Sequence, residues 1–216
     1  MLQTLFTCLA LASVTLTAPS NPPSYTKNSQ TDKQKFDNIA GVLGVAVAPV
    51  NDNSIYNNKK YNGFSLVESL APATNGVPGV IPQSDPNFIA FGPGDLQTIL
   101  QGDPAITLDF TDSETVAYDL LSFFFGCALG TEENVSSEPV NCTFTLTGYG
   151  PPPLNQKKGD ASFFFSPNNG MSVDMVPAVL PASFRGLYRT TFEVKSPAGA
   201  LVAGLVDNVE NAVYTK

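Results

Sequence analysis

The chain has 216 residues, of which 43% are hydrophobic and 14% charged, a composition typical of one globular domain with short additional segments. It contains no His and no Trp, and its formal net charge is −8. The absence of histidine excludes Ser-His-Asp and Cys-His nucleophile systems, His-ligated zinc or copper, and an imidazole general base. The segment Tyr61–Gln156 holds eleven Asp or Glu residues and no Lys or Arg. Because such a surface repels phosphates and anionic lipid headgroups, we expect neither nucleic acid nor a membrane as a partner.

The N-terminal segment predicts export. Residues 1–18 carry no charged side chain and include the apolar run Leu5–Leu16, which is typical of a secretory signal peptide and short for a membrane span. Cleavage is expected after Ala18 or as late as Ser20, and the protein is expected to be secreted, extracellular or in the cell wall. Residues 19–36 are polar and predict a flexible arm, which leaves 37–216 as the folded domain. Lys59-Lys60 is either a solvated turn or a processing site that makes 19–60 a propeptide.

The remaining chain predicts strand after strand, with Gly, Pro, Asn and Asp clusters between them. The clearest strand is Cys142–Tyr149, where apolar residues alternate with threonines. Short apolar segments such as Leu96–Leu100 are long enough for only one helical turn. This pattern predicts an all-β, antiparallel, jelly-roll-like sandwich in a single domain. The predicted strands are 39–50, 61–67, 88–91, 105–110, 116–127, 142–149, 162–165, 172–176, 187–195 and 200–206.

Two cysteines remain after removal of the signal peptide, Cys127 and Cys142. Each lies in an apolar alternation, so both sulfurs are expected to face one core and to form a disulfide, as an oxidising compartment favours. Asn134 and Asn141 begin N-glycosylation sequons in or beside the intervening loop. Asn134 is the better acceptor of the two, because the middle residue of the second sequon is Cys142.

Four segments form a pattern that extends over much of the chain: Tyr61–Phe64, Gly79–Asn87, Tyr118–Cys127 and Cys142–Gly148. Together they resemble a family of uncharacterised fungal secreted proteins. The segments Phe184–Tyr188, Phe192–Val194 and Val206–Val209 resemble the last strands of jelly-roll, galactose-binding-like domains and of carbohydrate-binding modules. The resemblance implies the sandwich fold and, by analogy, binding of a glycan or a cell-wall polysaccharide. The chain differs in one respect from many carbohydrate-binding modules, which stack sugars on Trp, because it contains no Trp.

Tyrosines are the candidate sugar platforms in a chain that lacks Trp. A sugar ring packs its C–H face on an aromatic ring while nearby polar groups bind the hydroxyls. Tyr56, Tyr61 and Tyr149 lie in or beside polar loops and are the glycan-binding candidates, although each also fits an ordinary strand-edge tyrosine. In the runs 123–125 and 163–165, alternation turns the middle residues, Phe124 and Phe164, away from their neighbours. Either Phe could mark an interaction surface or be covered by a loop.

Asp207 shares parity with Leu205 and Val209, so a regular strand directs its carboxylate inward. A buried carboxylate requires hydrogen bonds or a cation. In the resembling modules an Asp of the last strand often binds a structural calcium, which implies Asp207, with Glu68, as candidate ligands. The alternative is that Asp207 caps a turn by accepting backbone N–H groups. No other cofactor is expected.

Three functions follow from these observations. The first is a secreted, non-catalytic glycan-binding protein, and the second is an effector-type or structural protein that binds another protein through Phe124 or Phe164. The third is a polysaccharide hydrolase or lyase, for which the acidic stretch containing Asp109, Asp112, Glu114 and Asp119 supplies carboxylates. No motif selects a catalytic pair among them, so a non-enzymatic role is expected.

Overall fold

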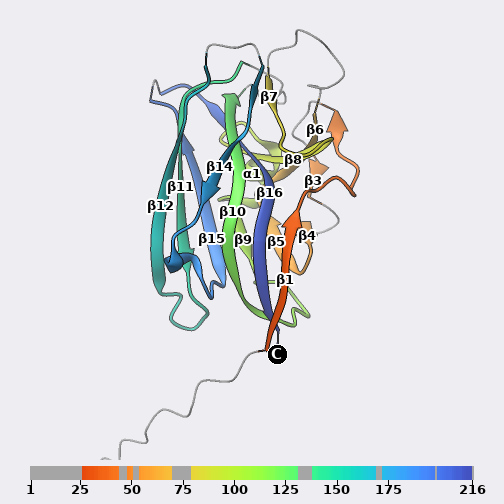
Figure 1. The fold of residues 1–216 in the computed structure, drawn as a ribbon, viewed down its shortest axis with the longest axis vertical. Coiled ribbons are helices and arrows are strands. Elements are labelled where there is room, and N and C mark those ends of the chain that lie inside the picture. Colours follow the sequence, from red (N-terminus) through yellow and green to blue (C-terminus); the bar gives the residue numbers. More distant parts are fainter. Residues whose placement is uncertain are drawn as a thin grey trace, which may run out of the picture.

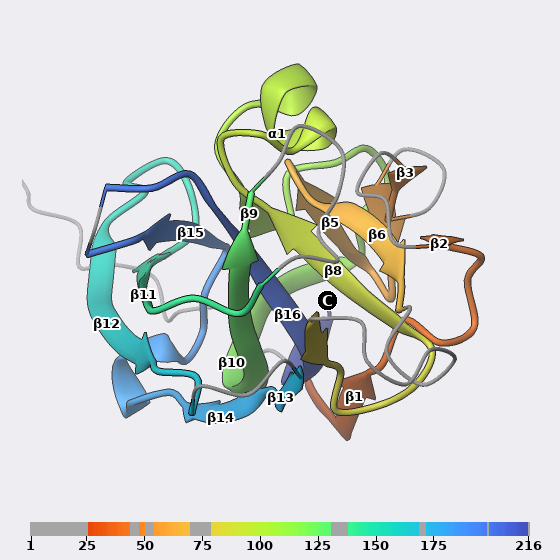
Figure 2. The same cartoon turned by 90° about the horizontal axis from the view of Figure 1, so that it is seen from above.

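The computed structural model describes residues 26–43, 48–50, 54–69, 79–130, 138–168, 172–197 and 199–215. Two large sheets pack face to face into a sandwich whose longest strands run along the long axis of the molecule (Figures 1 and 2). All strand pairs in them are antiparallel except β2–β6. The prediction of an all-β antiparallel sandwich is therefore confirmed.

One sheet has eight strands in the order β14-β10-β16-β8-β6-β2, with β1 paired to β16 and β3 to β6. Its centre is formed by the two longest strands, β10 and β16, which pair over almost their whole length. The bounds are β1 Thr26–Gln34, β2 Val42–Leu43, β3 Ala48–Pro49, β6 Ser65–Glu68, β8 Asn87–Phe91, β10 Thr115–Leu129, β14 Val176–Val179 and β16 Val202–Thr215.

The second sheet has six strands in the order β12-β11-β15-β9-β5-β4. Its bounds are β4 Ile55–Tyr56, β5 Lys59–Asn62, β9 Ala105–Thr107, β11 Cys142–Tyr149, β12 Lys157–Phe165 and β15 Arg189–Lys195. A separate parallel pair is formed by β7 Gly79–Ile81 and β13 Ser172–Asp174. Two helical elements lie wholly within the described residues, α1 Leu96–Gln101 and the 3₁₀ turn η2 Ala182–Phe184.

The core between the sheets is dominated by phenylalanine. Phe123 and Phe125 of β10 contact Phe144 of β11, with ring centroids 6.4 and 4.9 Å apart. Their parity was predicted from the alternation, and all three rings are buried. Phe164 has the opposite parity to Phe163 and Phe165 and is 58% exposed, whereas Phe124 is only half-buried.

Cys127 and Cys142 form the predicted disulfide, with Cα atoms 6.2 Å apart. The bond joins β10 of the eight-stranded sheet to β11 of the six-stranded sheet, so it holds the two layers together as well as closing a loop. Closing a loop of this length contributes about 3 kcal/mol in the chain-entropy model.

The polar arm predicted over 19–36 is wrong for its second half. Residues 26–34 form β1, which pairs with β16 from Thr26↔Thr215 to Gln34↔Val209. This strand is held to β16 by backbone hydrogen bonds, which need no apolar alternation, so the polar sequence did not reveal it. The folded domain therefore begins before residue 37.

Several other predicted strands differ from the structure in their bounds, among them 172–176, which the structure divides between β13 and β14. The single strand expected over 61–67 is two strands, β5 and β6, separated at Gly63, whose φ of +70° favours glycine. The strand expected over 39–50 is represented by β2 and β3, and residues 44–47 lie outside the described part of the chain. The last strand continues past Val206 to Thr215, because its polar second half lies between β10 and β1.

Candidate functional site

The outer face of the six-stranded sheet carries a row of polar side chains. In β11 the threonines and Tyr149 are half-buried and alternate with the fully buried Cys142, Phe144 and Leu146. In the neighbouring β15, Arg189 and Glu193 are exposed whereas Thr190 and Phe192 are buried. Because directly paired residues of antiparallel strands share a face, this register places the polar residues of β9, β11 and β15 side by side.

A pocket of about 640 Å³ opens on this face. This volume lies within the range of small-molecule and sugar sites, roughly 300–1,000 Å³. The lining combines two tyrosines with carboxylates, hydroxyls, an amide and a guanidinium. Its residues are Asp103, Thr107, Asp109, Thr145, Thr147, Tyr149, Asn155, Tyr188, Arg189, Thr191, Phe192 and Glu193.

Tyr149 and Tyr188 are held next to each other by the backbone. The Tyr188 N–H donates to the Tyr149 carbonyl at 2.9 Å, and the Tyr188 carbonyl accepts from Leu108 N–H at 3.0 Å. Both side chains are half-buried, so each presents part of its ring to the pocket. Partial burial, and to a lesser degree the negative charge of Asp109, raise the pKa of Tyr188. Its hydroxyl therefore stays protonated at neutral pH and can donate a hydrogen bond.

The polar groups around the tyrosines are partly fixed by contacts with one another. The Thr107 hydroxyl accepts from the Asp109 N–H at 3.1 Å, and the Thr147 hydroxyl donates to Asp160 Oδ1 at 2.8 Å. Lys157 lies 2.5 Å from Asp160 and, together with Thr147, lowers the pKa of that carboxyl. Three carboxylates and one arginine line the pocket itself, so the charge of its wall is negative.

Of the three predicted platform residues, only Tyr149 lines this pocket. Tyr61 is 0% exposed and Tyr56 is also buried, so for these two the prediction of a sugar platform is wrong. Their rings pack with Phe36, whose centroid lies 5.2 Å from that of Tyr56 and 5.5 Å from that of Tyr61. The neighbouring asparagines indicated a polar loop, but both tyrosines lie on the core-facing side of the β4–β5 hairpin.

Tyr188 is the pocket tyrosine that the sequence did not predict. In a regular strand over 187–195, alternation would place it on the inner face with Thr190 and Phe192. The regular strand begins only at Arg189, and Tyr188 lies in a bend before it, so the alternation does not extend to this side chain. The signal in the sequence was a tyrosine directly before a charged residue, Arg189.

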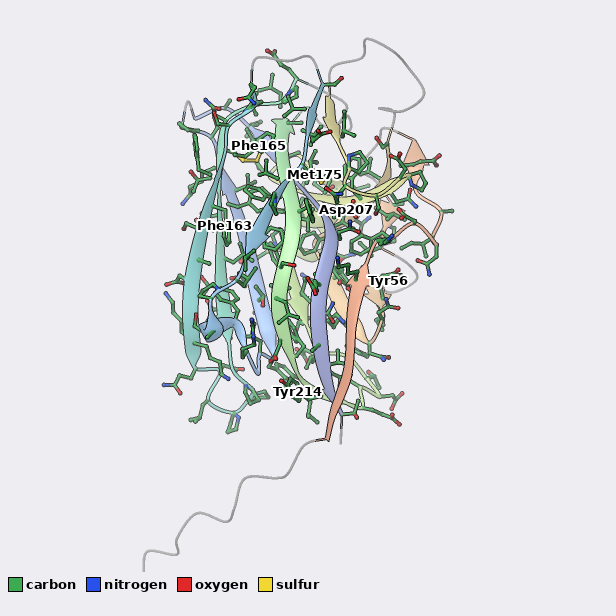
Figure 3. The ribbon with its side chains drawn as sticks, in the orientation of Figure 1. Tyr56, Phe163, Phe165, Met175, Asp207 and Tyr214 are labelled. Atoms are coloured by element: carbon green, nitrogen blue, oxygen red, sulfur yellow. A yellow bond between two sulfur atoms is a disulfide. The ribbon has the colours of Figure 1, made fainter. Side chains whose placement is uncertain are left out.

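Asp207 is 0% exposed, as predicted, and its carboxylate accepts backbone hydrogen bonds. Ser84 N–H donates to Oδ2 at 2.7 Å and Asn208 N–H to Oδ1 at 2.6 Å. Burial raises the pKa of Asp207 to about 7, and repulsion from Asp37 adds to the increase. Figure 3 shows its place on β16.

The acidic group that acts on Asp207 is therefore Asp37 and not the predicted Glu68, which lies at the end of β6 as the register partner of Asn87. Among the described residues, no three Asp, Glu, Cys or His side chains come together where they could bind a metal ion. The contacts of Asp207 are those expected of a carboxylate that caps a turn by accepting backbone N–H groups.

The remaining predicted residues lie elsewhere. Asn141 is exposed next to Cys142, at the rim of a second pocket, whereas Asn134 lies outside the described residues. Asp119 is buried and accepts from Gly186 N–H and the Tyr214 hydroxyl, at 2.8 and 2.7 Å. Of the acidic stretch, Asp109 is the residue that lines the first pocket.

Comparison with known proteins finds a solved structure that is similar to this chain. A DUF4465 family protein from Bacteroides caccae ATCC 43185 is 14% identical, with a TM-score of 0.46 over 90% of this chain and 100% of that one. No family model and no curated protein matches the chain. Over the described residues, no helix is both long and apolar enough to cross a membrane. The disulfide is compatible with an extracellular protein.

Proposed function

We propose that this chain is a secreted, non-catalytic protein that binds a glycan in the pocket formed by β9, β11 and β15. The observation that carries the proposal is the adjacency of Tyr149 and Tyr188 at the wall of a 640 Å³ pocket whose other lining residues, apart from Phe192, are polar or charged. Aromatic rings offer an apolar surface to the C–H face of a sugar, and the surrounding hydroxyl, amide and carboxylate groups match its hydroxyls.

The charge of the pocket indicates which glycans it accepts. Asp103, Asp109, Glu193 and Arg189 are the charged residues that line the pocket, and Glu193 is paired with Lys195 at 2.7 Å. Asp103 and Asp109 therefore leave the wall negative, within a protein whose formal net charge is −8. A wall of this sign repels uronic-acid and sulfated polymers and attracts amino groups. Neutral or amino-sugar polysaccharides are therefore the proposed ligands.

The test is binding of the purified protein to insoluble polysaccharides and to a glycan array. Tyr149→Ala and Tyr188→Ala are expected to weaken binding by about tenfold each, which corresponds to about 1.4 kcal/mol. Tyr188→Phe retains the ring and is expected to retain most of the affinity. Phe164→Ala is the matched control, because Phe164 is exposed but is not among the pocket-lining residues.

Two outcomes would contradict the proposal. Binding to no glycan, together with capture of a protein that depends on Phe164, would favour the protein-binding alternative. Release of reducing ends that Asp109→Asn abolishes would favour a carboxylate enzyme.

A further inference from the structure

A buried lysine and a buried asparagine contact each other across the sandwich. Lys59 belongs to β5 of the six-stranded sheet and Asn211 to β16 of the eight-stranded sheet, and each is 1% exposed. The Lys59 Nζ atom lies 2.9 Å from Asn211 Oδ1 and 3.0 Å from the Asn57 carbonyl oxygen. The Asn211 amide nitrogen donates to the Val209 carbonyl at 3.3 Å, which fixes the orientation of the amide.

The surroundings of this pair are mostly aromatic and apolar, and they include an acidic residue by register, because Asp32 of β1 is the direct partner of Asn211 on β16. Tyr56 is the cross-strand partner of Lys59, and Tyr61 follows two residues later on the same face. Both tyrosines are buried and pack with Phe36. On the other sheet, Asn211 is paired with Leu120, which is fully buried. Figure 3 shows Tyr56 at this part of the molecule.

We propose that Lys59 and Asn211 form an intramolecular amide bond. In this step the neutral Nζ amine attacks Cγ of Asn211, a bond forms between Nζ and Cγ, and the bond between Cγ and Nδ2 breaks. The proton lost by Nζ passes to Nδ2, which leaves as ammonia. The reaction is balanced without an oxidant, a reductant or a cofactor.

Three features of the site favour this reaction. Removal from water disfavours an ammonium ion relative to the neutral amine, which is the nucleophilic form. The two groups are held in contact by strands of two packed sheets, so the reaction is intramolecular and needs no encounter step. The wall of aromatic side chains excludes water, which would otherwise compete as a nucleophile. The product would join the sheets at a point distinct from the disulfide.

The test is the mass of the intact, disulfide-reduced protein. The wild type is expected to be lighter than its sequence by one molecule of ammonia, and digestion is expected to yield one branched peptide that contains both residues. Lys59→Ala and Asn211→Ala are expected to show the full sequence mass. Asn211→Asp is expected to lose water in place of ammonia and to reach the same final mass as the wild type.

The proposal is overturned if the folded wild type has its full sequence mass and yields Lys59 and Asn211 on separate, unmodified peptides. It is also overturned if the ammonia deficit persists in Lys59→Ala, because the deficit would then arise within Asn211 or elsewhere. The measurement on the wild type decides the question even if a variant does not fold.

Discussion

Asp207 combines a buried carboxylate with donors that hold it in place. Ser84 and Asn208 supply backbone N–H groups, which lie 2.7 and 2.6 Å from the carboxylate oxygens. These bonds favour the ionised form, whereas burial and Asp37 favour the protonated form and have the larger effect. The result is a group that titrates near neutrality.

The stability of the protein is expected to fall as the pH rises from about 4 to about 7 through this group. The pKa of Asp207 is about 7 in the folded state and about 3.9 in the unfolded state, so the folded state binds the proton more tightly. The contribution is complete below pH 4 and is lost as the pH passes 7. Urea unfolding at pH 5 and pH 8 measures it, and Asp207→Asn is expected to flatten the dependence. A wild-type dependence equal to that of the variant would contradict this assignment.

A second prediction concerns calcium at the same residue. Because both carboxylate oxygens of Asp207 already accept backbone N–H groups, we expect the same melting temperature in calcium and in chelator. A bound cation would raise the melting temperature by mass action. Thermal unfolding in the two buffers measures the difference. A calcium-dependent rise that Asp207→Asn abolishes would establish Asp207 as a ligand instead.

At the scale of the elements, the packing of β16 against the aromatic core requires a glycine at position 204. A Cβ atom at Gly204 would lie 2.7 Å from a carbon of Phe91 and 2.8 Å from one of Phe144. Phe91 and Phe144 are themselves buried and in edge contact, with centroids 5.3 Å apart, so neither ring has space to move. The close packing of the two sheets here requires a residue without a side chain.

Gly204→Ala is therefore expected to destabilise the fold by about 1–3 kcal/mol, the usual cost of overpacking a core. Gly79→Ala in β7 is the matched control, because a Cβ atom there meets nothing within 4 Å. Its effect is expected to stay within about 0.5 kcal/mol. Chemical unfolding of the three proteins measures both values, and equal stabilities for the two variants would refute the packing argument.

At the scale of the whole molecule, the features predicted correctly from the sequence are those that the alternation of apolar and polar residues determines by itself. β11 was predicted with the bounds it has, because its buried and half-buried residues alternate without interruption. The same rule directed Cys127 and Cys142 to one core, where they form a disulfide. Alternation does not reveal which strands become neighbours, and the candidate pocket depends on this, because β9, β11 and β15 are far apart in the chain.

The errors have a related origin. Tyr56 and Tyr61 stand between asparagines and lysines, and their burial comes from the packing of Phe36, which itself follows β1. β1 is polar and could not be predicted from the hydrophobic pattern. The burial of residues that depend on the position of Phe36, shortly after β1, could therefore not be predicted either. The contact between Lys59 and Asn211 could not be predicted for a different reason, because it joins residues 152 positions apart in the chain.

The pairing of β1 with β16 also determines how the molecule would respond to mechanical force. Thr26 and Thr215 are direct partners, so the start of β1 and the end of β16 lie side by side at one end of the sandwich (Figure 1). Tension applied between these two points would act perpendicular to the two strands and would load the backbone hydrogen bonds between them one after another. The hydrogen bonds would then break in sequence from this end, because the two strands are pulled apart and not slid past each other. We expect β1 to detach at low force while the rest of the sandwich remains intact.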